Sequence, residues 1–300
     1  MKNIELNMRF FKTLLFEKTS RIAEFLGHKN HIAIRYFLKF GKRINWKQPE
    51  DLNQLICKEM VYGNHPEWTI YADKIRVHEY IKSIGLGHIL RPIITQYKTA
   101  GDIDFSELPD KCVLKTTNGF YDKIFYDRKK DCDEKRIRKH FAKLEKRKFG
   151  KRTGELHYVS IPYMIFAEPL IDISLQDFSS SSAADYKMWF IDGQYRGTHI
   201  IFDRNGDNKK HQWRDINWKM KNDYLIETPH NFISDIEIPK PAKLDEMINY
   251  GKKITQGQKV LRVDFYVIEN RPFLGEITCT SYCGLIDQYS DKALKELISS

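Results

Sequence analysis

Apolar side chains recur at helical spacing along the first part of the chain. They do so over residues 10–26 and 32–40, where basic residues separate them. The run Pro49-Glu50-Asp51 has the proline and the acids that are typical of a first helical turn, and another helix is expected over residues 74–84. The pattern therefore predicts that the chain begins as a set of helices.

Short apolar runs between turn residues predict strands in the remainder. The expected strands cover residues 89–94, 111–115, 123–126, 158–170, 186–191, 195–202, 260–268 and 272–277. Asp192-Gly193-Gln194 and Glu269-Asn270-Arg271 are expected to be hairpin turns, and segment 239–255 is expected to end in a helix. Segments 179–184 and 204–223 are expected to be surface loops. Helices and antiparallel strands alternate irregularly, which predicts an α+β protein, or an α/β protein with mixed sheets.

Composition limits the class of protein. The chain has 300 residues, of which 41% are hydrophobic, and no uncharged apolar run approaches the length that spans a bilayer. The first residues lack the basic-then-apolar order of a signal peptide. Five scattered cysteines are an odd number, which favours reduced thiols. We therefore expect a cytoplasmic protein, with peripheral contact at the inner face of the membrane as an open alternative.

The positive charge is concentrated in one segment. Residues 128–152 hold thirteen Lys or Arg and four Asp or Glu, a net +9 of the +10 that the whole chain carries. Ile137, Phe141 and Leu144 follow helical spacing there and predict a packed face. The basic residues expected to face outward are Lys135, Arg136, Arg138, Lys139, Lys143 and Lys146. Such a helix either attracts a polyanion or is simply solvated, and charge alone cannot choose between these.

Two carboxylates interrupt the last predicted hairpin. Asp264 lies in its first strand and Glu276 in its second. Alternate residues of paired strands share a face, so both side chains can meet on one side. Paired carboxylates repel each other unless a cation lies between them, and hard oxygen ligands suit Mg²⁺. The alternative is that each acid pairs with a lysine or an arginine.

Two further segments have features of a nucleotide site. Lys115 ends a predicted strand immediately before Thr116-Thr117-Asn118-Gly119, a combination that suits phosphate, although an ordinary hairpin turn has the same pattern. The apolar strand 164–170 ends at Glu168, which could accept from the amino group of adenine. Its alternative is a buried strand that reaches the surface.

The order of these segments resembles that of ATP-grasp enzymes. More narrowly, it is similar to the TupA-like branch, which is associated with teichuronopeptide and other surface-polysaccharide biosynthesis. The narrower resemblance is carried by segments 71–77, 108–115, 185–187 and 202–204, and the whole resemblance covers roughly residues 40–285.

The resemblance implies an α+β, ATP-grasp fold in which two subdomains grip ATP. Its expected parts are a helical N-terminal region (1–67), an N-terminal ATP-grasp portion (68–110), a lid subdomain with the basic helix (111–173) and a core with the metal-binding hairpin (174–300).

The resemblance also implies a role for each matching residue. Residues expected to bind ATP are Lys74, Lys115, Thr117, Asn118, Gly119, Glu168, Leu170 and Lys187. Those expected to hold Mg²⁺ are Asp264, Glu276 and Thr278, the last of which stands where the family usually has asparagine. Arg262 is expected to stabilise the transferred phosphoryl group, and Arg204 to do the same or to bind a substrate carboxylate.

The implied activity is ATP-dependent ligation of a carboxylate to an amine through an acyl phosphate. The expected substrates are an acidic glycan with uronic-acid carboxylates and an amino acid or other amine, and no nucleic-acid partner is expected. Two alternatives stay open: a glycan-modifying transferase or kinase, and a non-catalytic polyanion-binding protein on a degenerate ATP-grasp scaffold.

Overall fold

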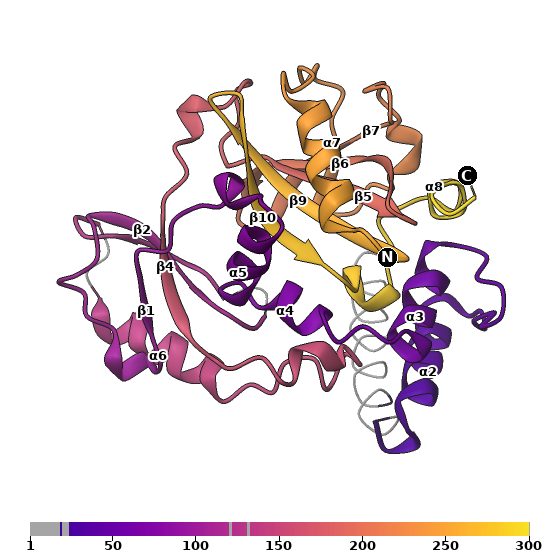
Figure 1. The fold of residues 1–300 in the computed structure, drawn as a ribbon, viewed down its shortest axis with the longest axis horizontal. Helices are drawn as coiled ribbons and strands as arrows, with labels where there is room; N and C mark the ends of the chain where they lie inside the picture. The colour runs from indigo at the N-terminus through magenta and orange to yellow at the C-terminus, as the bar shows by residue number, and fades with distance from the viewer. Residues whose placement is uncertain (1–18, 20–23, 120–121, 131–132, 300) are drawn as a thin grey trace, which may run out of the picture.

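A computed structural model describes residue 19 and residues 24–119, 122–130 and 133–299 (Figure 1). The helix expected over residues 10–26 lies almost entirely outside the described residues, and only its last residues are seen, as the 3-10 turn η1 (Glu24–Leu26). The second expected helix is confirmed as α2 (His28–Phe40), which ends at Gly41 with a left-handed φ of 67°.

Three further helices follow before the first strand. They are α3 (Leu52–Tyr62), α4 (Trp68–Ala72) and α5 (Arg76–Ser83). The predicted helix start at Asp51 is confirmed, because its side chain accepts from the backbone N–H of Gln54 and so caps α3. The 3-10 turn η2 (Gly87–Ile89) then leads towards the sheets.

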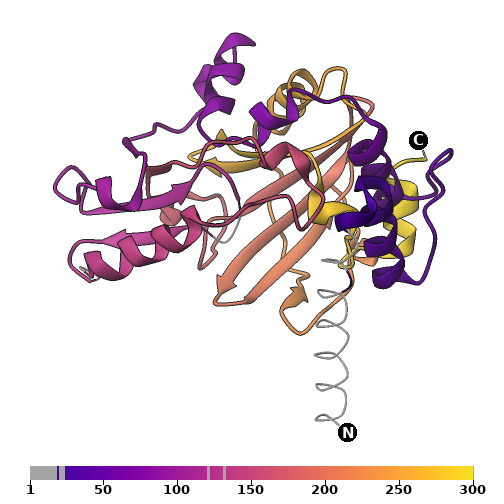
Figure 2. The same ribbon diagram turned by 90° about the horizontal axis from the view of Figure 1, so that it is seen from below.

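The smaller sheet has four antiparallel strands in the order β1-β4-β2-β3. Its strands are β1 (Thr95–Tyr97), β2 (Lys111–Thr116), β3 (Ile124–Asp127) and β4 (Ile165–Pro169). The basic helix is confirmed as α6 (Glu134–Glu145), whose Ile137, Phe141 and Leu144 pack against one face of this sheet. Alternation places Lys115 and Glu168 on the opposite face. In Figure 2 this sheet and α6 form one end of the molecule.

The larger sheet has six strands in the order β10-β9-β5-β6-β7-β8. Its strands are β5 (Asp185–Ile191), β6 (Gln194–Asn205), β7 (Asn208–Arg214), β8 (Asn231–Ile233), β9 (Val260–Ile268) and β10 (Arg271–Thr278). Both predicted hairpins, β5–β6 and β9–β10, are confirmed. Helix α5 and α7 (Leu244–Ile254) cover one face over the main hydrophobic core (Figure 1). Part of the other face packs on α3 and α8 (Asp291–Glu296).

Short 3-10 turns connect these elements. They are η3 (Ala100–Asp102), η4 (Leu156–Tyr158), η5 (Ile173–Leu175), η6 (Asn222–Tyr224) and η7 (Ser281–Gly284). Within the residues that the structure describes, no helix is long and apolar enough to cross a bilayer. The four cysteines among those residues are free thiols, as expected.

Two strand predictions in the smaller sheet are corrected. Residues 89–94 were expected to form a strand, but strand β1 begins only at Thr95; Pro92 interrupts the expected strand because it has no N–H to donate to a ladder. The strand expected over residues 158–170 is confirmed only for Ile165–Pro169. Its first half contains Pro162 and is irregular after η4.

The prediction of a surface loop over residues 204–223 is wrong. Most of its first half is strand β7, in which His211, Gln212 and Trp213 are buried. The side-chain amide of Gln212 is tolerated there because it is hydrogen-bonded: its Nε2 donates to the carbonyl oxygens of Ser234 and Ile236, both at 2.8 Å. A buried strand made of polar residues has the sequence pattern of a loop.

Arg138 does not face outward as expected. Its guanidinium donates to the carbonyl oxygens of Ala100 (2.9 Å), Gly101 (2.7 Å) and Ile103 (2.7 Å), and so fastens η3 to α6. The other basic residues expected on the outward face of α6 are exposed.

Candidate functional site

The strand register of the larger sheet brings three predicted site residues into one row. Glu276 of β10 lies opposite Asp264 of β9, and Asp264 lies opposite Lys187 of β5. Opposite residues share a face, so the predicted meeting of the two carboxylates is confirmed. A register shift between Leu274 and Glu276, at Gly275, sets this alignment. A Cβ on Gly275 would lie 2.9 Å from the ring of Tyr266, so glycine permits the close approach of the strands there.

Asp264 is buried and held by two cations. Its carboxylate accepts from Arg262 Nε at 2.7 Å and Nη2 at 2.8 Å, and also from Lys187 Nζ. Burial opposes the charge on Arg262, but attraction to Asp264 outweighs it, so the pKa of Arg262 lies above its usual value. The expected alternative, pairing with lysine and arginine, therefore describes Asp264 in the free protein.

Glu276 has a different environment. It is exposed, and among the described residues it makes no ion pair; its Oε1 accepts only from Thr278 Oγ1 at 3.3 Å. Thr278 Oγ1 in turn accepts from Arg262 Nη2 at 3.0 Å. Arg262 Nη1 donates to Ser281 Oγ at 2.6 Å, so one guanidinium organises this end of the hairpin.

The donor chemistry of this group fits Mg²⁺ only if a ligand contributes oxygens. Asp264, Glu276 and Thr278 offer hard oxygen donors close together. Within the described part of the chain, no cluster of three or more His, Cys, Asp or Glu residues could hold a metal by itself. Mg²⁺ is commonly bound by one or two carboxylates together with water and substrate phosphates. The residues therefore suit a metal that arrives with a phosphate.

A second carboxylate links Lys187 to Arg204. Asp185, which lies two residues before Lys187 on the same face, is 3.5 Å from Lys187 Nζ and forms an ion pair with Arg204. Burial opposes ionisation of Asp185, but Lys187 and Arg204 outweigh it and hold its pKa below the usual range. The structure thus brings four predicted residues, Lys187, Arg204, Arg262 and Asp264, into one alternating network of charges.

On the smaller sheet, the predicted site residues Lys115 and Glu168 form an ion pair. Lys115 Nζ donates to Glu168 Oε2 at 2.6 Å. Arg91, which the sequence analysis missed, donates from Nη1 to the same oxygen at 3.0 Å and from Nη2 to the carbonyl of Pro169. Burial alone would raise the pKa of Glu168, but Lys115 and then Arg91 outweigh it and lower that pKa. Leu170, just beyond the strand, is 41% exposed.

The loop after Lys115 is held by Lys74. Its Nζ donates to the carbonyl oxygens of Thr116 (3.2 Å) and Gly119 and lies 3.5 Å from Asp122 Oδ2. Gly119 has a φ of 133°, and a Cβ there would meet the ring of Phe149 at 2.6 Å, so the position requires glycine. Asn118 is half-buried in this loop.

Thr117 has no free polar group to offer a ligand in this arrangement. Its N–H donates to the carbonyl of Met164 at 3.0 Å, and its hydroxyl donates to the carbonyl of Pro162 at 2.6 Å. Thr117 is also buried. It therefore fastens the loop to the segment before β4, in contrast to the expected contact with phosphate.

The charges of the two groups of residues act on one another at Lys123. Lys123, immediately before β3 of the smaller sheet, lies close enough to Arg204 and Asp185 of the larger sheet to feel their charges. Desolvation by its surroundings lowers the pKa of Lys123, and repulsion from Arg204 lowers it further. Each sheet therefore carries its own cluster of predicted residues, with carboxylates and cations in both.

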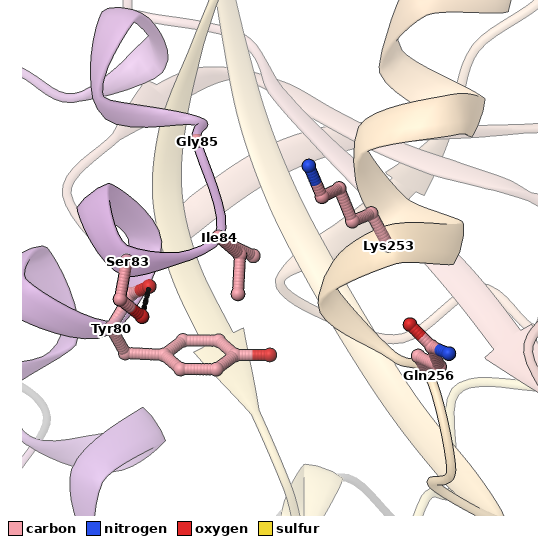
Figure 3. A pocket seen from close by; sticks show the side chains of 6 residues that line it. All are labelled: Tyr80, Ser83, Ile84, Gly85, Lys253 and Gln256. Atoms are coloured by element: carbon pink, nitrogen blue, oxygen red, sulfur yellow. Dashed lines mark hydrogen bonds between the residues drawn. The ribbon is translucent and has the colours of Figure 1, made fainter.

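The open cavity in Figure 3 is separate from this site. It measures about 530 Å³, lies where α5 and α7 end, and is lined by Tyr80, Ser83, Ile84, Gly85, Lys253 and Gln256. None of the predicted site residues lines it.

Sequence reasoning missed Arg91, Asp122 and Ser281. Arg91 lies beside Pro92 in a segment that was interpreted as a strand, and no spacing links it to Glu168, 77 positions away. Asp122 and Ser281 lie close in sequence to the predicted residues, but only the fold shows their contacts. Asp122 accepts from the N–H of Thr116 at 2.9 Å, and the Ser281 hydroxyl accepts from Arg262 at 2.6 Å.

Comparison with known proteins identifies the family. The family described as TupA-like ATPgrasp matches residues 52–299. No curated protein matches the chain.

Solved structures resemble the chain at low identity. They include a D-alanine–D-alanine ligase from Bacillus anthracis, with 17% identity and a TM-score of 0.40, covering 70% of this chain and 57% of that one. Another is a D-alanine–D-alanine ligase from Helicobacter pylori, with 15% identity and a TM-score of 0.40, covering 76% and 60%. A third is the ATP-grasp ligase PsnB complexed with a minimal precursor, Mg and ADP, with 13% identity and a TM-score of 0.39, covering 76% and 57%. The chain spans less than two thirds of the length of each.

Proposed function

The chain belongs to the TupA-like ATP-grasp family, and on that premise we propose that it is an ATP-dependent carboxylate–amine ligase. The observation that carries the proposal is the row of Glu276, Asp264 and Lys187 on the larger sheet, together with Lys115 and Glu168 on one face of the smaller sheet. Cations and carboxylates placed in this way suit the meeting of two anions, a triphosphate and a carboxylate substrate, better than they suit a neutral ligand.

The proposed nucleotide lies with its base at the end of β4 and its phosphates towards the larger sheet. Glu168 and the backbone at Leu170 hold the base, and Lys115 and Lys187 contact the phosphates. Lys74 acts on the same ligand by holding the loop at Gly119 in place. Mg²⁺ held by Asp264, Glu276 and Thr278 would offset the charge of the phosphates.

The chemical step follows from where the charges lie. A carboxylate oxygen of the substrate attacks the γ-phosphorus of ATP, and the bond between this phosphorus and the β,γ-bridging oxygen breaks. ADP is the leaving group, and the substrate becomes an acyl phosphate. Arg262 and Lys187 neutralise the charge that develops on the transferred group. Arg204 orients the substrate carboxylate. An amine then attacks the acyl carbon, loses a proton and expels inorganic phosphate, which yields the amide.

The proposed substrates are a uronic-acid carboxylate of a surface glycan and an amino acid. The family branch and the basic face of α6 support this choice. That face lies on the side of the smaller sheet away from Lys115, so α6 acts by long-range attraction of an acidic glycan and makes no contact with the reacting groups. Because the basic face of α6 is separate from Lys115, it also favours a second candidate, a polyanion-binding protein in which α6 is the binding surface.

An assay of ADP and inorganic phosphate release tests the proposal. The wild type is mixed with Mg-ATP, oligogalacturonate and a panel of amino acids, and hydroxylamine is added in parallel to trap an acyl phosphate as a hydroxamate. A ligase releases ADP and inorganic phosphate in equal amounts. Release of ADP with the phosphate kept on the glycan would contradict ligation and favour a kinase.

Charge variants on α6 separate the two candidates. We expect a higher KM for oligogalacturonate, with kcat unchanged, when glutamine replaces Lys135, Lys139, Lys143 and Lys146. High salt should raise the KM of the wild type in the same way. The polyanion-binding protein would be favoured instead if the wild type binds the glycan but releases no ADP, and the variant no longer binds the glycan.

A further inference from the structure

Arg91 occupies the acceptor groups at the end of β4. It lies in the irregular segment between η2 and β1, and its side chain is only 12% exposed. The guanidinium forms an ion pair with Glu168 Oε2 at 3.0 Å and also donates to the carbonyl oxygen of Pro169. A planar guanidinium is suited to such two-point contacts, which a lysine could not make in the same way.

Lys115 makes the cluster positively charged. Its Nζ lies 2.6 Å from Glu168 Oε2, the same oxygen that Arg91 contacts. Two cations therefore share one carboxylate, which is itself only 10% exposed. Arg91 is not needed to neutralise Glu168, because Lys115 already does so. Its presence needs another explanation.

The contacts of Arg91 change what the strand end offers a nucleobase. The acceptors there are the Glu168 carboxylate and the Pro169 carbonyl, and Arg91 donates to both. Pro169 has no N–H, so it contributes no donor of its own. With Arg91 in place, guanidinium N–H groups stand where a base would otherwise find free acceptors.

Purine bases differ at this edge. Position 6 of adenine carries an amino group, which must donate, whereas position 6 of hypoxanthine carries an oxygen, which must accept. Arginine is a common partner of a 6-oxo purine for this reason. A base at the end of β4 is therefore read partly by Arg91.

We propose that Arg91 is a specificity-determining residue of the nucleotide site, which competes with the 6-amino group of adenine and thereby weakens the preference for ATP over 6-oxo nucleotides. This inference rests on the proposed nucleotide site. It adds to that proposal the residue that controls recognition of the base.

Calorimetric titration with Mg-ATP and Mg-ITP tests it, since these nucleotides differ at position 6 and share their phosphates. In the wild type the two Kd values are expected to lie within about threefold of each other. In Arg91→Met the ratio of Kd for ITP to Kd for ATP should rise about three- to tenfold, because adenine regains acceptors worth one hydrogen bond. The ratio cancels any general effect of the lost charge on phosphate binding.

Arg138→Met is the matched control. Arg138 also donates to backbone carbonyls, but it does so on the far side of the smaller sheet, so its loss should leave the ratio unchanged. Arg91→Lys is a second variant that keeps the charge and cannot make the paired contact. Its ratio should lie between those of the wild type and Arg91→Met.

The outcomes are distinguishable. If the wild type binds ATP and both Arg91→Met and Arg91→Lys keep the wild-type ratio of Kd values, the role of Arg91 is overturned and the proposed function stands. Parallel weakening of both nucleotides would show that Arg91 only fixes the strand end, which also overturns the inference. A wild type that binds neither nucleotide would remove the proposed site and the inference together.

Discussion

Asp264 and Glu276 share a row of the sheet but differ in what surrounds them. Asp264 is buried between Arg262 and Lys187, whereas Glu276 is exposed and accepts only from Thr278 among the described residues. The first carboxylate therefore contributes to both the fold and the site, and the second mainly to the site. Removing each charge should separate these roles.

We predict that Asp264→Asn lowers the free energy of unfolding by about 3 kcal/mol, because it leaves the buried Arg262 without its counter-charge and removes one of the two partners of Lys187. Glu276→Gln should change it by less than about 0.5 kcal/mol, as expected for an exposed side chain. Urea unfolding of both variants measures this difference. Equal losses of stability would contradict the account of the pair.

Single residues could be predicted from the sequence where strand alternation decides their position. Asp264 and Glu276 were placed together because they lie in the two strands of a hairpin with a short turn. Arg91 could not be found in this way, since its partner is distant in sequence and its own segment has no regular periodicity. The contacts of the Thr117 hydroxyl could not be predicted either, because its burial under residues 162–164 is a property of the fold.

At the scale of elements, the prediction failed where polar residues are buried. Strand β7 contains a buried histidine, His211, whose Nδ1 is 3.2 Å from Nε2 of His199 on β6. His199 Nδ1 is 2.9 Å from the hydroxyl of Tyr289, and His211 Nε2 is buried without a partner in the described residues. His199 lies opposite Lys187 in the strand register, so the pair is on the same face of the larger sheet as the row of site residues.

The histidine pair makes stability depend on pH. Burial, and then Lys209, lower the pKa of His211 to about 4, and burial also lowers the pKa of His199. In the unfolded chain both histidines take up protons below about pH 6.5, whereas the folded protein keeps them neutral. The unfolded state therefore binds more protons in this range, and stability falls as the pH falls from about 6.5 towards 4.

Between pH 7 and pH 5 we predict that His211 alone removes about 2 kcal/mol from the free energy of unfolding. Urea unfolding at the two pH values measures the loss, which should be smaller in His211→Gln. His230→Gln, a change at an exposed histidine, should leave the loss as it is in the wild type. The same pH dependence in His211→Gln as in the wild type would contradict the prediction.

At the scale of the whole molecule, the family and the ATP-grasp fold that the sequence predicted are confirmed by the match over residues 52–299. The order of motifs carried this prediction, because several separated segments in one order constrain a fold more than any one of them does. The placement of the two sheets relative to each other could not be derived from periodicity, since periodicity describes one element at a time. The division at residues 67, 110 and 173 stays a prediction.

The central claim is that Mg-ATP binds between the two sheets, and thermal unfolding with and without Mg-ATP tests it most directly. At about a hundred times Kd, the nucleotide should stabilise the wild type by roughly 2.7 kcal/mol, and the effect should require Mg²⁺. It should be weaker in Lys115→Ala and Glu276→Gln and unchanged in Lys135→Ala, which alters an exposed lysine of α6. No stabilisation of the wild type at millimolar Mg-ATP, or equal stabilisation of all four proteins, would contradict the nucleotide site.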